Sequence, residues 1–259
     1  MTKNPPHPPA PVPGVALITG AADRIGAAIA TRLAAEGWAV VIHYRTQGDK
    51  AEALAASLPR ATAIRADLTR RDDRAGLIAA AAAPFGPLTL LVNNASVFNR
   101  DSARDLDEAL WDAHFALHVE APAFLARDFA AQLPPDSAGN IINLIDSRVL
   151  NLAPAYLSYT LSKSALWTLT RTLAQSLAPA IRVNAIGPGP AEPPPGVSPE
   201  AHAAKLAALP LKSSANAEAL ADGVMAILAL KSMTGQMLAL DGGEHLEWPA
   251  RRGPTPRRP

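Results

Sequence analysis

Short runs of aliphatic residues alternate with longer alanine-rich stretches along most of the chain. Strands of a parallel sheet are buried on both faces, so they are expected to be continuously apolar and to be connected by helices. The pattern predicts strands at 15–19, 39–43, 62–65, 88–92, 140–145, 182–186 and 236–239. It predicts helices at 24–36, 48–57, 71–83, 105–130, 155–178 and 215–229.

This order of elements is typical of the α/β class. We expect a doubly wound (Rossmann-like) parallel sheet of about seven strands, with helices on both faces, in a single domain. Such sheets bind their ligands at the carboxyl ends of the strands. The residues that directly follow each strand are therefore the first candidates for a functional site.

Proline marks the limits of the predicted domain. Residues 1–13 are rich in proline, and residues 249–259 consist mainly of arginine and proline. Both segments are predicted to be disordered extensions, which leaves 14–248 as the folded domain. A third proline cluster, at 188–199, lies between well-patterned segments and is predicted to form a loop over a site.

Charge and composition exclude several classes of function. The chain has 24 Lys and Arg against 23 Asp and Glu, but five of the cations lie in the two extensions, so the domain itself is acidic. Nucleic-acid binding is therefore not expected. The sequence contains no cysteine, which excludes thiol chemistry. We predict no metal site, and we expect a cytoplasmic location. No signal-peptide core is present, and prolines and asparagines interrupt the charge-free run at 75–99, so no membrane span is expected.

A turn containing two glycines follows the first predicted strand. The sequence from Thr19 to Gly26 reads TGAADRIG and enters the first helix near Arg24. Small residues such as Gly20 let the backbone approach a phosphate, whose negative charge is favoured by the helix N-terminus. The spacing alone also fits an ordinary strand-to-helix turn. Its place in the α/β pattern favours a dinucleotide site that includes Ile25.

The second predicted strand ends in His43, Tyr44 and Arg45, where a dinucleotide-binding fold places the adenosine ribose. An acidic residue here would hold the 2′-hydroxyl of NAD, whereas an arginine pairs with the 2′-phosphate of NADP. Arg45, together with Arg24 in the preceding turn, therefore predicts NADPH as the cofactor. The alternative is that both arginines are ordinary solvated side chains.

Polar residues also follow the third and fourth predicted strands. Asp67 is a candidate to accept a hydrogen bond from the adenine amino group, or equally to cap the following helix. Asn93, Ala95 and Ser96 stand where a cofactor that crosses the edge of the sheet needs small and amide side chains. A polar turn is the alternative for this segment.

Tyr159 and Lys163 lie four residues apart on a predicted helix and therefore share one face. A phenol titrates near ~10 in water, so a nearby cation is needed if it is to act as an acid or base at neutral pH. Lys163 is predicted to lower the pKa of Tyr159 in this way. Asp146, at the end of the fifth strand, is predicted to share a proton with the phenol. Tyr156 is a weaker candidate, because no cation follows it four residues later. The alternative for Tyr159 and Lys163 is a surface tyrosine beside a solvated lysine.

In their order along the chain, these motifs resemble those of the short-chain dehydrogenase/reductase family over about residues 14–248. The matching segments are TGAADRIG at 19–26, Asp67-Leu68, NNAS at 93–96, Tyr159-x-x-x-Lys163, Arg182-Val183-Asn184, Gly187-Pro188-Gly189 and Asp241-Gly242-Gly243. Within the family, the chain is most similar to the pteridine reductases and the dihydromonapterin reductases. That similarity is carried by Arg24, by the segment 43–45, and by Asp146, which stands where most of the family has serine.

The resemblance implies an NADPH-dependent oxidoreductase in which Tyr159 supplies the proton and Lys163 holds the nicotinamide ribose. It also implies that Leu68, Pro188 and Gly189 belong to the cofactor site. The protein chain would supply binding and orientation, because the hydride chemistry belongs to the cofactor.

The resemblance also implies a substrate site formed by Ser96, Phe98, Asp146 and Tyr159. Phe98 would stack on a flat heteroaromatic ring, which stabilises such a ligand by about 1 kcal/mol beyond area burial. The expected substrate is a small molecule, either a planar dihydropterin or dihydrofolate reduced at C=N, or a carbonyl compound. Relatives are commonly homotetramers, so a homo-oligomer is expected.

Three departures from the family pattern keep two alternatives open. His118 stands where the family usually has an asparagine that supports a water relay to the lysine. Ser147 directly follows Asp146, so the chain would be a carbonyl or 3-oxoacyl reductase if Ser147 assists Tyr159 instead. The loop at 190–195 lacks the threonine that many relatives use to bind the nicotinamide amide. His118 and this loop also allow a catalytically drifted, NADP(H)-binding regulatory protein.

Overall fold

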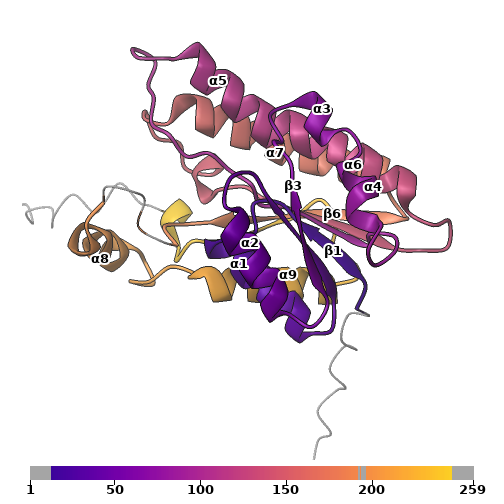
Figure 1. Cartoon of the computed structure of the whole chain (residues 1–259). Helices are drawn as coiled ribbons and strands as arrows, with labels where there is room; N and C mark the ends of the chain where they lie inside the picture. The colour runs from indigo at the N-terminus through magenta and orange to yellow at the C-terminus, as the bar shows by residue number, and fades with distance from the viewer. Residues whose placement is uncertain (1–12, 192, 194–196, 247–259) are drawn as a thin grey trace, which may run out of the picture.

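The computed structural model describes residues 13–191, 193 and 197–246. The predicted extensions at 1–13 and 249–259 lie outside these residues, except for Pro13. Figure 1 shows one sheet with helices packed on both of its faces. The structure thus confirms the predicted doubly wound α/β fold.

Within the described part of the chain, seven parallel strands form the sheet in the order β3-β2-β1-β4-β5-β6-β7. They are β1 (Val15–Ile18), β2 (Ala39–Tyr44), β3 (Ala61–Arg65), β4 (Leu90–Asn93), β5 (Gly139–Leu144), β6 (Ile181–Pro188) and β7 (Met237–Leu240). Each predicted strand is present, and its ends differ from the prediction by about two residues at most. The strand order reverses between β1 and β4, which leaves a crevice at the carboxyl ends of the strands.

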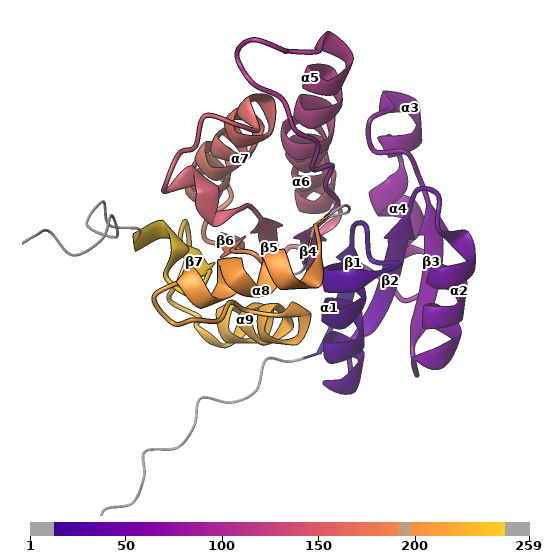
Figure 2. The same cartoon turned by 90° about the vertical axis from the view of Figure 1, so that its left-hand side faces the viewer.

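Two layers of helices enclose the sheet, as Figure 2 shows in a view turned by 90°. One face is covered by α1 (Arg24–Ala35), α2 (Gly48–Ser57) and α9 (Ala217–Ala229). The other face is covered by α4 (Leu77–Ala82), α6 (Ala121–Gln132) and α7 (Leu157–Ser176). Helix α5 (Glu108–Phe115) packs alongside α7, and the short α3 (Arg71–Arg74) precedes α4.

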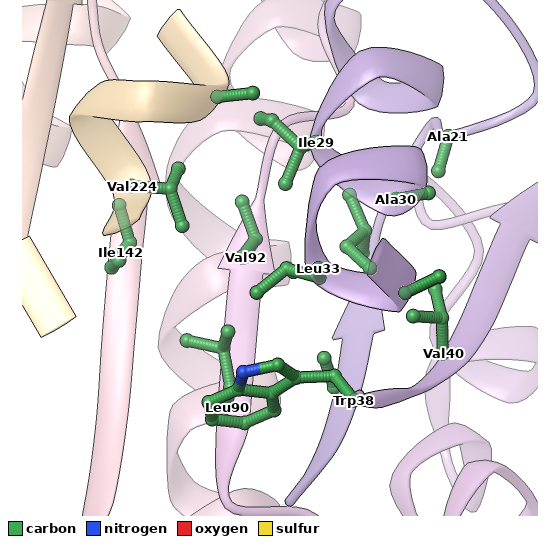
Figure 3. Close-up of a cluster of buried hydrophobic side chains, with 14 of the residues drawn as sticks. Ala21, Ile29, Ala30, Leu33, Trp38, Val40, Leu90, Val92, Ile142 and Val224 are labelled. Atoms are coloured by element: carbon green, nitrogen blue, oxygen red, sulfur yellow. The ribbon is translucent and has the colours of Figure 1, made fainter. Parts of the chain in front are cut away.

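The core beneath α1 and α9 is built from aliphatic side chains at helical spacing. Ile29 and Leu33 of α1 and Val224 of α9 gather over Val92 of β4, and Trp38 closes the cluster at one end (Figure 3). These residues are buried. Burial of each aliphatic side chain stabilises the fold by about 1.5–3 kcal/mol relative to exposure.

Successive residues of β1 supply both cores, because neighbouring side chains of a strand point to opposite faces. Ala16 and Ile18 join the core under α1 and α9, whereas Val15 and Leu17 join the core on the other face, where Phe129 of α6 is fully buried. This burial on both faces explains why the strand is apolar at every position.

The helix predicted at 71–83 is interrupted in the structure. Helices α3 and α4 are separated at Gly76, which has a φ of +85°. Glycine adopts this left-handed conformation without the steric cost that a side chain would bring. The prediction of one continuous helix was wrong because a single glycine between a charged segment and an alanine-rich one gives no clear sign of a break.

The helix predicted at 105–130 contains a wider turn. It is formed by α5, the π-helical segment η1 (Ala116–Glu120) and α6. Pro122 has no N–H to donate to the carbonyl group of His118, four residues earlier, so the regular hydrogen-bond pattern fails at this point.

The proline-rich segment at 188–199, which was predicted to form a loop, begins at the end of β6, and residues 192 and 194–196 within it lie outside the described residues. It is followed by a helix that the hydrophobic pattern did not predict, α8 (Pro199–Ala208). Its start is well defined, because the hydroxyl of Ser198 accepts a hydrogen bond from the backbone N–H of Ala201 at 3.2 Å and Pro199 occupies the first turn. None of its side chains is buried. A helix without a buried stripe leaves no periodic signal in the sequence.

We expect Phe129→Ala to lower the free energy of unfolding by about 3–5 kcal/mol, because it empties a fully buried position. Phe124→Ala is the matched control on the same helix, where the ring is 40% exposed and lies beside the guanidinium groups of Arg74 and Arg127. The control is expected to cost about 1 kcal/mol. Urea unfolding measures both values, and equal losses would contradict the assignment of Phe129 to the core.

Candidate active site

A cavity with a volume of about 690 Å³ opens at the carboxyl edge of the sheet, where the strand order reverses. Cofactor and substrate sites typically have volumes of about 300–1,000 Å³. Helix α8 lies beside this edge (Figure 2) and lines the cavity with Ala201, His202 and Lys205. The cavity is therefore bounded by the sheet edge on one side and by the unpredicted helix on another.

All but one of the predicted site residues line this cavity. They are Gly20, Arg24, Ile25, Gly26, His43, Tyr44, Arg45, Asp67, Leu68, Ala95, Ser96, Phe98, Asp146, Tyr159, Lys163, Pro188 and Gly189. These residues are far apart in the sequence, and the parallel strands bring them to a single edge of the sheet.

Asn93 is the exception, because its side chain points into the core and not into the cavity. Its side chain is buried at the end of β4 and donates to Oδ1 of Asn143 at 2.8 Å, while Nδ2 of Asn143 donates to the hydroxyl of Thr170 at 2.8 Å. This chain of hydrogen bonds joins two strands to α7. The next residue, Asn94, lines the cavity instead and donates to the carbonyl oxygen of Gly20 at 3.0 Å.

The turn after β1 leaves no space for side chains at its two glycines. A Cβ atom on Gly20, whose φ is +61°, would lie 2.9 Å from the Cα atom of Ala95. A Cβ atom on Gly26 would lie 2.5 Å from the carbonyl oxygen of Gly20. Bare backbone at the start of α1 therefore faces the cavity, and such a surface fits the phosphates of a dinucleotide.

His43 holds this turn in place. The N–H of Gly20 donates to Nδ1 of His43 at 3.1 Å, so Nε2 carries the proton and donates to the carbonyl oxygen of Ala66 at 3.1 Å. Burial lowers the pKa of His43 to about 4, so the ring is neutral at physiological pH. Its side chain thus positions the glycine turn against the loop that follows β3.

Asp67 uses one carboxylate oxygen within its own loop. Oδ1 accepts hydrogen bonds from the backbone N–H of Thr69 at 3.0 Å and from its hydroxyl at 2.7 Å. Partial burial opposes ionisation, but these bonds and the charges of Arg45 and Arg70 lower the pKa of Asp67. Asp67 therefore stabilises the turn as expected of a capping residue, and it also lines the cavity.

Tyr159, Asp146 and Lys163 meet where the end of β5 approaches α7. The Tyr159 hydroxyl donates to Oδ2 of Asp146 at 2.9 Å. Nζ of Lys163 donates to the carbonyl oxygen of Leu144 at 2.8 Å and lies 5.7 Å from the centre of the Tyr159 ring. Tyr159 and Lys163 are both buried, with 5% and 2% of their surface exposed.

Burial controls the titration of all three groups. It raises the pKa of Tyr159 well above 10, and the carboxylate of Asp146 adds to this increase. Burial also raises the pKa of Asp146 and lowers the pKa of Lys163 to about 8. The predicted lowering of the phenol pKa by Lys163 was wrong for this geometry, because the amine binds Leu144 and the carboxylate is the phenol's direct partner. Tyr159 therefore keeps its proton and is placed as a donor.

His118 lies in the π-helical segment, and its ring is held in one tautomer. Nε2 accepts from the backbone N–H of Val97 at 3.3 Å, so Nδ1 carries the proton and donates to the hydroxyl of Ser162 at 2.8 Å. Burial lowers the pKa of His118, so the ring is neutral. The hydroxyl of Ser96 lies 3.0 Å from Nε2 and also lowers the pKa of Tyr159. His118 therefore reaches the phenol through Ser96.

Ser147 points away from the phenol. It is buried, and its hydroxyl donates to Oε2 of Glu244 at 3.4 Å. The cavity is lined by Asp146 and not by Ser147. Between the two candidates left open by the sequence, the structure makes Asp146 the partner of Tyr159.

Two aromatic residues and an arginine form a wall of the cavity. Phe98 stacks on Tyr156 with ring centres 4.4 Å apart and meets Tyr159 edge-on at 4.8 Å. The guanidinium carbon of Arg148 lies 4.9 Å from the centre of the Tyr156 ring. We define these residues, Phe98, Tyr156 and Arg148, as the aromatic wall.

Sequence reasoning missed Tyr156 and Arg148 at this wall. Tyr156 was set aside because no cation follows it four residues later, a criterion that tests only for an acid–base pair. The available signal was position: Arg148 follows β5 by a few residues, and Tyr156 directly precedes α7. The cavity-lining residues of α8 gave no comparable signal.

Within the described ranges, no group of three or more His, Asp or Glu side chains is arranged to hold a metal ion. None of the helices in the same part of the chain is long and apolar enough to span a membrane.

Comparison with known proteins assigns the whole domain to one group. The family model described as enoyl-(acyl carrier protein) reductase matches residues 20–245. The putative ketoacyl reductase 2 of the granaticin polyketide synthase of Streptomyces violaceoruber is 32% identical over 245 residues, 92% of this chain and 98% of that protein. A short-chain type dehydrogenase/reductase of Picea abies is 35% identical over 190 residues, 68% of this chain and 70% of that protein.

A solved structure is more similar still. FolM alternative dihydrofolate reductase 1 from Brucella canis, in complex with NADP, is 46% identical and superposes with a TM-score of 0.86. The match covers 93% of this chain and 96% of that one. The similarity therefore extends over nearly the whole of both chains.

We expect Asp146→Asn to lower the pKa of Lys163 further below about 8, because the carboxylate of Asp146 is the charge that favours the protonated amine. NMR titration of the lysine side chain measures this value. Asp128→Asn is the matched control, since Asp128 pairs with Arg127 outside the cavity. A Lys163 amine that titrates like an exposed lysine in the unmodified protein would contradict the described geometry.

Proposed function

The chain belongs to the short-chain dehydrogenase/reductase family, and from this premise we propose that it is an NADPH-dependent reductase of a dihydropterin or dihydrofolate. As a member of this family it is an oxidoreductase. The similarity to FolM alternative dihydrofolate reductase supports the choice of substrate. The observation that carries the proposal is the hydrogen bond between Tyr159 and Asp146 inside a cavity that also contains the glycine turn.

NADP(H) is the cofactor, and the Brucella canis structure contains NADP. The bare backbone at Gly20 and Gly26 fits its pyrophosphate, and Arg45, which lines the cavity after β2, is placed for the 2′-phosphate. When bound, its nicotinamide supplies the hydride. Tyr159 and Lys163 would hold the nicotinamide ribose.

Tyr159 donates the proton that accompanies the hydride. Its raised pKa keeps the hydroxyl protonated before the reaction, and Asp146 orients it through the hydrogen bond of 2.9 Å. After the proton has moved to the substrate nitrogen, the Ser96 hydroxyl, which lowers the pKa of Tyr159, helps to stabilise the phenolate. Asp146, whose pKa is raised by burial, is suited to return a proton to the phenol.

The substrate is held between the reactive end of the cavity and Phe98. The Phe98 ring lies edge-on to Tyr159, so a flat heteroaromatic ring beside the phenol lies within reach of its face. Ser96 adds a hydroxyl at the same place and is itself fixed by His118. A flat, polar, nitrogen-containing ring matches these groups better than an aliphatic ketone does.

A carbonyl or 3-oxoacyl reductase is the second candidate. The granaticin relative, described as a putative ketoacyl reductase, favours it. The same Tyr159 and Lys163 would serve that reaction. The contact of Ser147 with Glu244 argues against it, because that hydroxyl is engaged away from the phenol. A drifted, NADP(H)-binding regulatory protein is less favoured, because the hydrogen-bonded groups of a proton donor are all in place.

We further propose a homotetramer in the cytoplasm. Exposed apolar side chains on the layer of long helices, such as Phe124 on α6 at 40% and Leu161 on α7 at 45%, support packing between copies. The absence of cysteine from the sequence fits a reducing compartment.

The proposal is tested by NADPH consumption with dihydropterins, dihydrofolate, quinones and ketones, with NADH run in parallel. Reduction of a dihydropterin or dihydrofolate in preference to ketones is the expected result. Oxidation of NADPH by simple ketones but never by a reduced pterin would show that the substrate class is wrong.

Tyr159→Phe is expected to lower kcat by about 10²–10⁴-fold, because the ring remains and the proton donor is lost. Retained NADPH binding, measured by cofactor fluorescence, would separate this loss from misfolding. Tyr156→Phe is the matched control: it removes a hydroxyl three residues earlier and keeps the stacking on Phe98. Comparable losses in the two variants would remove Tyr159 from the role of proton donor.

Arg45→Ala is expected to lower kcat/KM for NADPH about tenfold relative to kcat/KM for NADH, because the variant loses one charge-assisted contact to the 2′-phosphate. Arg32→Ala is the control, since Arg32 of α1 pairs with Glu36 just beyond the helix and does not line the cavity. An unchanged ratio for Arg45→Ala would assign cofactor preference to other residues.

A further inference from the structure

Arg148 is a cation in the substrate half of the cavity that the proposed reaction does not use. It follows β5, on the side of the sheet away from β2 and β3, where Arg45 and Asp67 mark the adenosine end. Its guanidinium carbon lies 4.9 Å from the centre of the Tyr156 ring and 5.9 Å from that of Phe98. The cation is thus next to the ring that is proposed to stack on the substrate.

The guanidinium of Arg148 has no acceptor within the described part of the chain. Its Nε atom is buried without a hydrogen-bond partner, and no ion pair within 4.0 Å joins Arg148 to a carboxylate there. A buried donor left without an acceptor destabilises the folded state. Aromatic faces hold the cation in place but do not satisfy its N–H groups.

The neighbouring charges are already engaged. Asp146 accepts from the Tyr159 hydroxyl at 2.9 Å and from the backbone N–H of Arg148 at 2.8 Å. Lys205, on α8, pairs with Glu244 at 3.0 Å. No hydrogen bond or ion pair joins the Arg148 side chain to either carboxylate, although the charge of Arg148 lowers the pKa values of both Asp146 and Tyr159.

We propose that Arg148 binds a carboxylate on the side chain of the substrate, which makes it a determinant of specificity for anionic acceptors such as dihydrofolate. This inference rests on the proposed function and deepens it. Guanidinium and carboxylate form paired, charge-assisted hydrogen bonds, and the planar fork of arginine matches the two carboxylate oxygens. Phe98 and Tyr156 hold the guanidinium plane in advance, so less conformational entropy is lost on binding.

The test compares two substrates that share the ring and differ in charge. Dihydrofolate carries carboxylates on its side chain, whereas dihydrobiopterin carries a neutral one. In Arg148→Gln, the ratio of kcat/KM for dihydrofolate to kcat/KM for dihydrobiopterin is expected to fall about tenfold, chiefly through KM. Arg148→Lys keeps the charge but not the fork and is expected to give an intermediate ratio.

Arg60→Gln is the matched control, because Arg60 also lies over an aromatic ring, that of Phe85 at 5.7 Å, and is outside the cavity. Thermal unfolding of each variant reports whether the fold is intact. An equal loss for both substrates in Arg148→Gln and Arg148→Lys would overturn the proposal, because it would make Arg148 a support of the aromatic wall alone.

Failure of the proposed function would be visible separately. If the unmodified protein oxidises NADPH with neither dihydrofolate nor dihydrobiopterin, the proposed substrate class is wrong. The same variants are then compared with acetoacetate and its neutral ethyl ester as substrates. A selective loss of activity with the anion in Arg148→Gln supports a carboxylate site in that case as well. Equal losses with the acid and the ester overturn it.

Discussion

The hydrogen bond from the Tyr159 hydroxyl to the Asp146 carboxylate connects the end of β5 to the first turn of α7. One turn further along the helix, Lys163 binds the carbonyl oxygen of Leu144, at the end of the same strand. The two contacts together set the register between strand and helix. Each places a polar group in an apolar environment where only a formed hydrogen bond offsets the cost of burial. Loss of one partner would therefore disturb the position of the others.

A second set of contacts sets the position of α7 from the opposite side. His114 and His118 lie four residues apart on α5 and η1, and Ser158 and Ser162 lie four residues apart on α7. The Nδ1 atoms of the two histidines lie 2.7 and 2.8 Å from the two serine hydroxyls. These two histidine–serine contacts hold α5 and η1 against α7 on either side of Tyr159. His118 is thus one of a matched pair of contacts, in a helix that widens ahead of Pro122.

Hydrophobic pattern and motif order were sufficient for the fold and for most of the cavity, because both depend on features that repeat along the chain. Continuous apolar runs identify strands buried on both faces, and residues such as Gly20 and Asp146 follow them directly. The direction of the Asn93 side chain could not be predicted from these features, because a shift of one residue along β4 changes whether a side chain faces the core or the cavity. The pKa of Tyr159 depends on burial and on which group the amine of Lys163 binds. Both are properties of the packed structure.

Helix α8 differs from these elements, since it buries none of its side chains. It contacts the short 3-10 helix η3 (Glu244–Leu246) through the ion pair between Lys205 and Glu244. Substitutions on such a helix cost little folding stability, because little apolar surface is removed from water when it forms. This side of the cavity can therefore diverge between homologous enzymes faster than the sheet edge that it faces. New substrate preferences can evolve there while the proton-donating machinery stays the same.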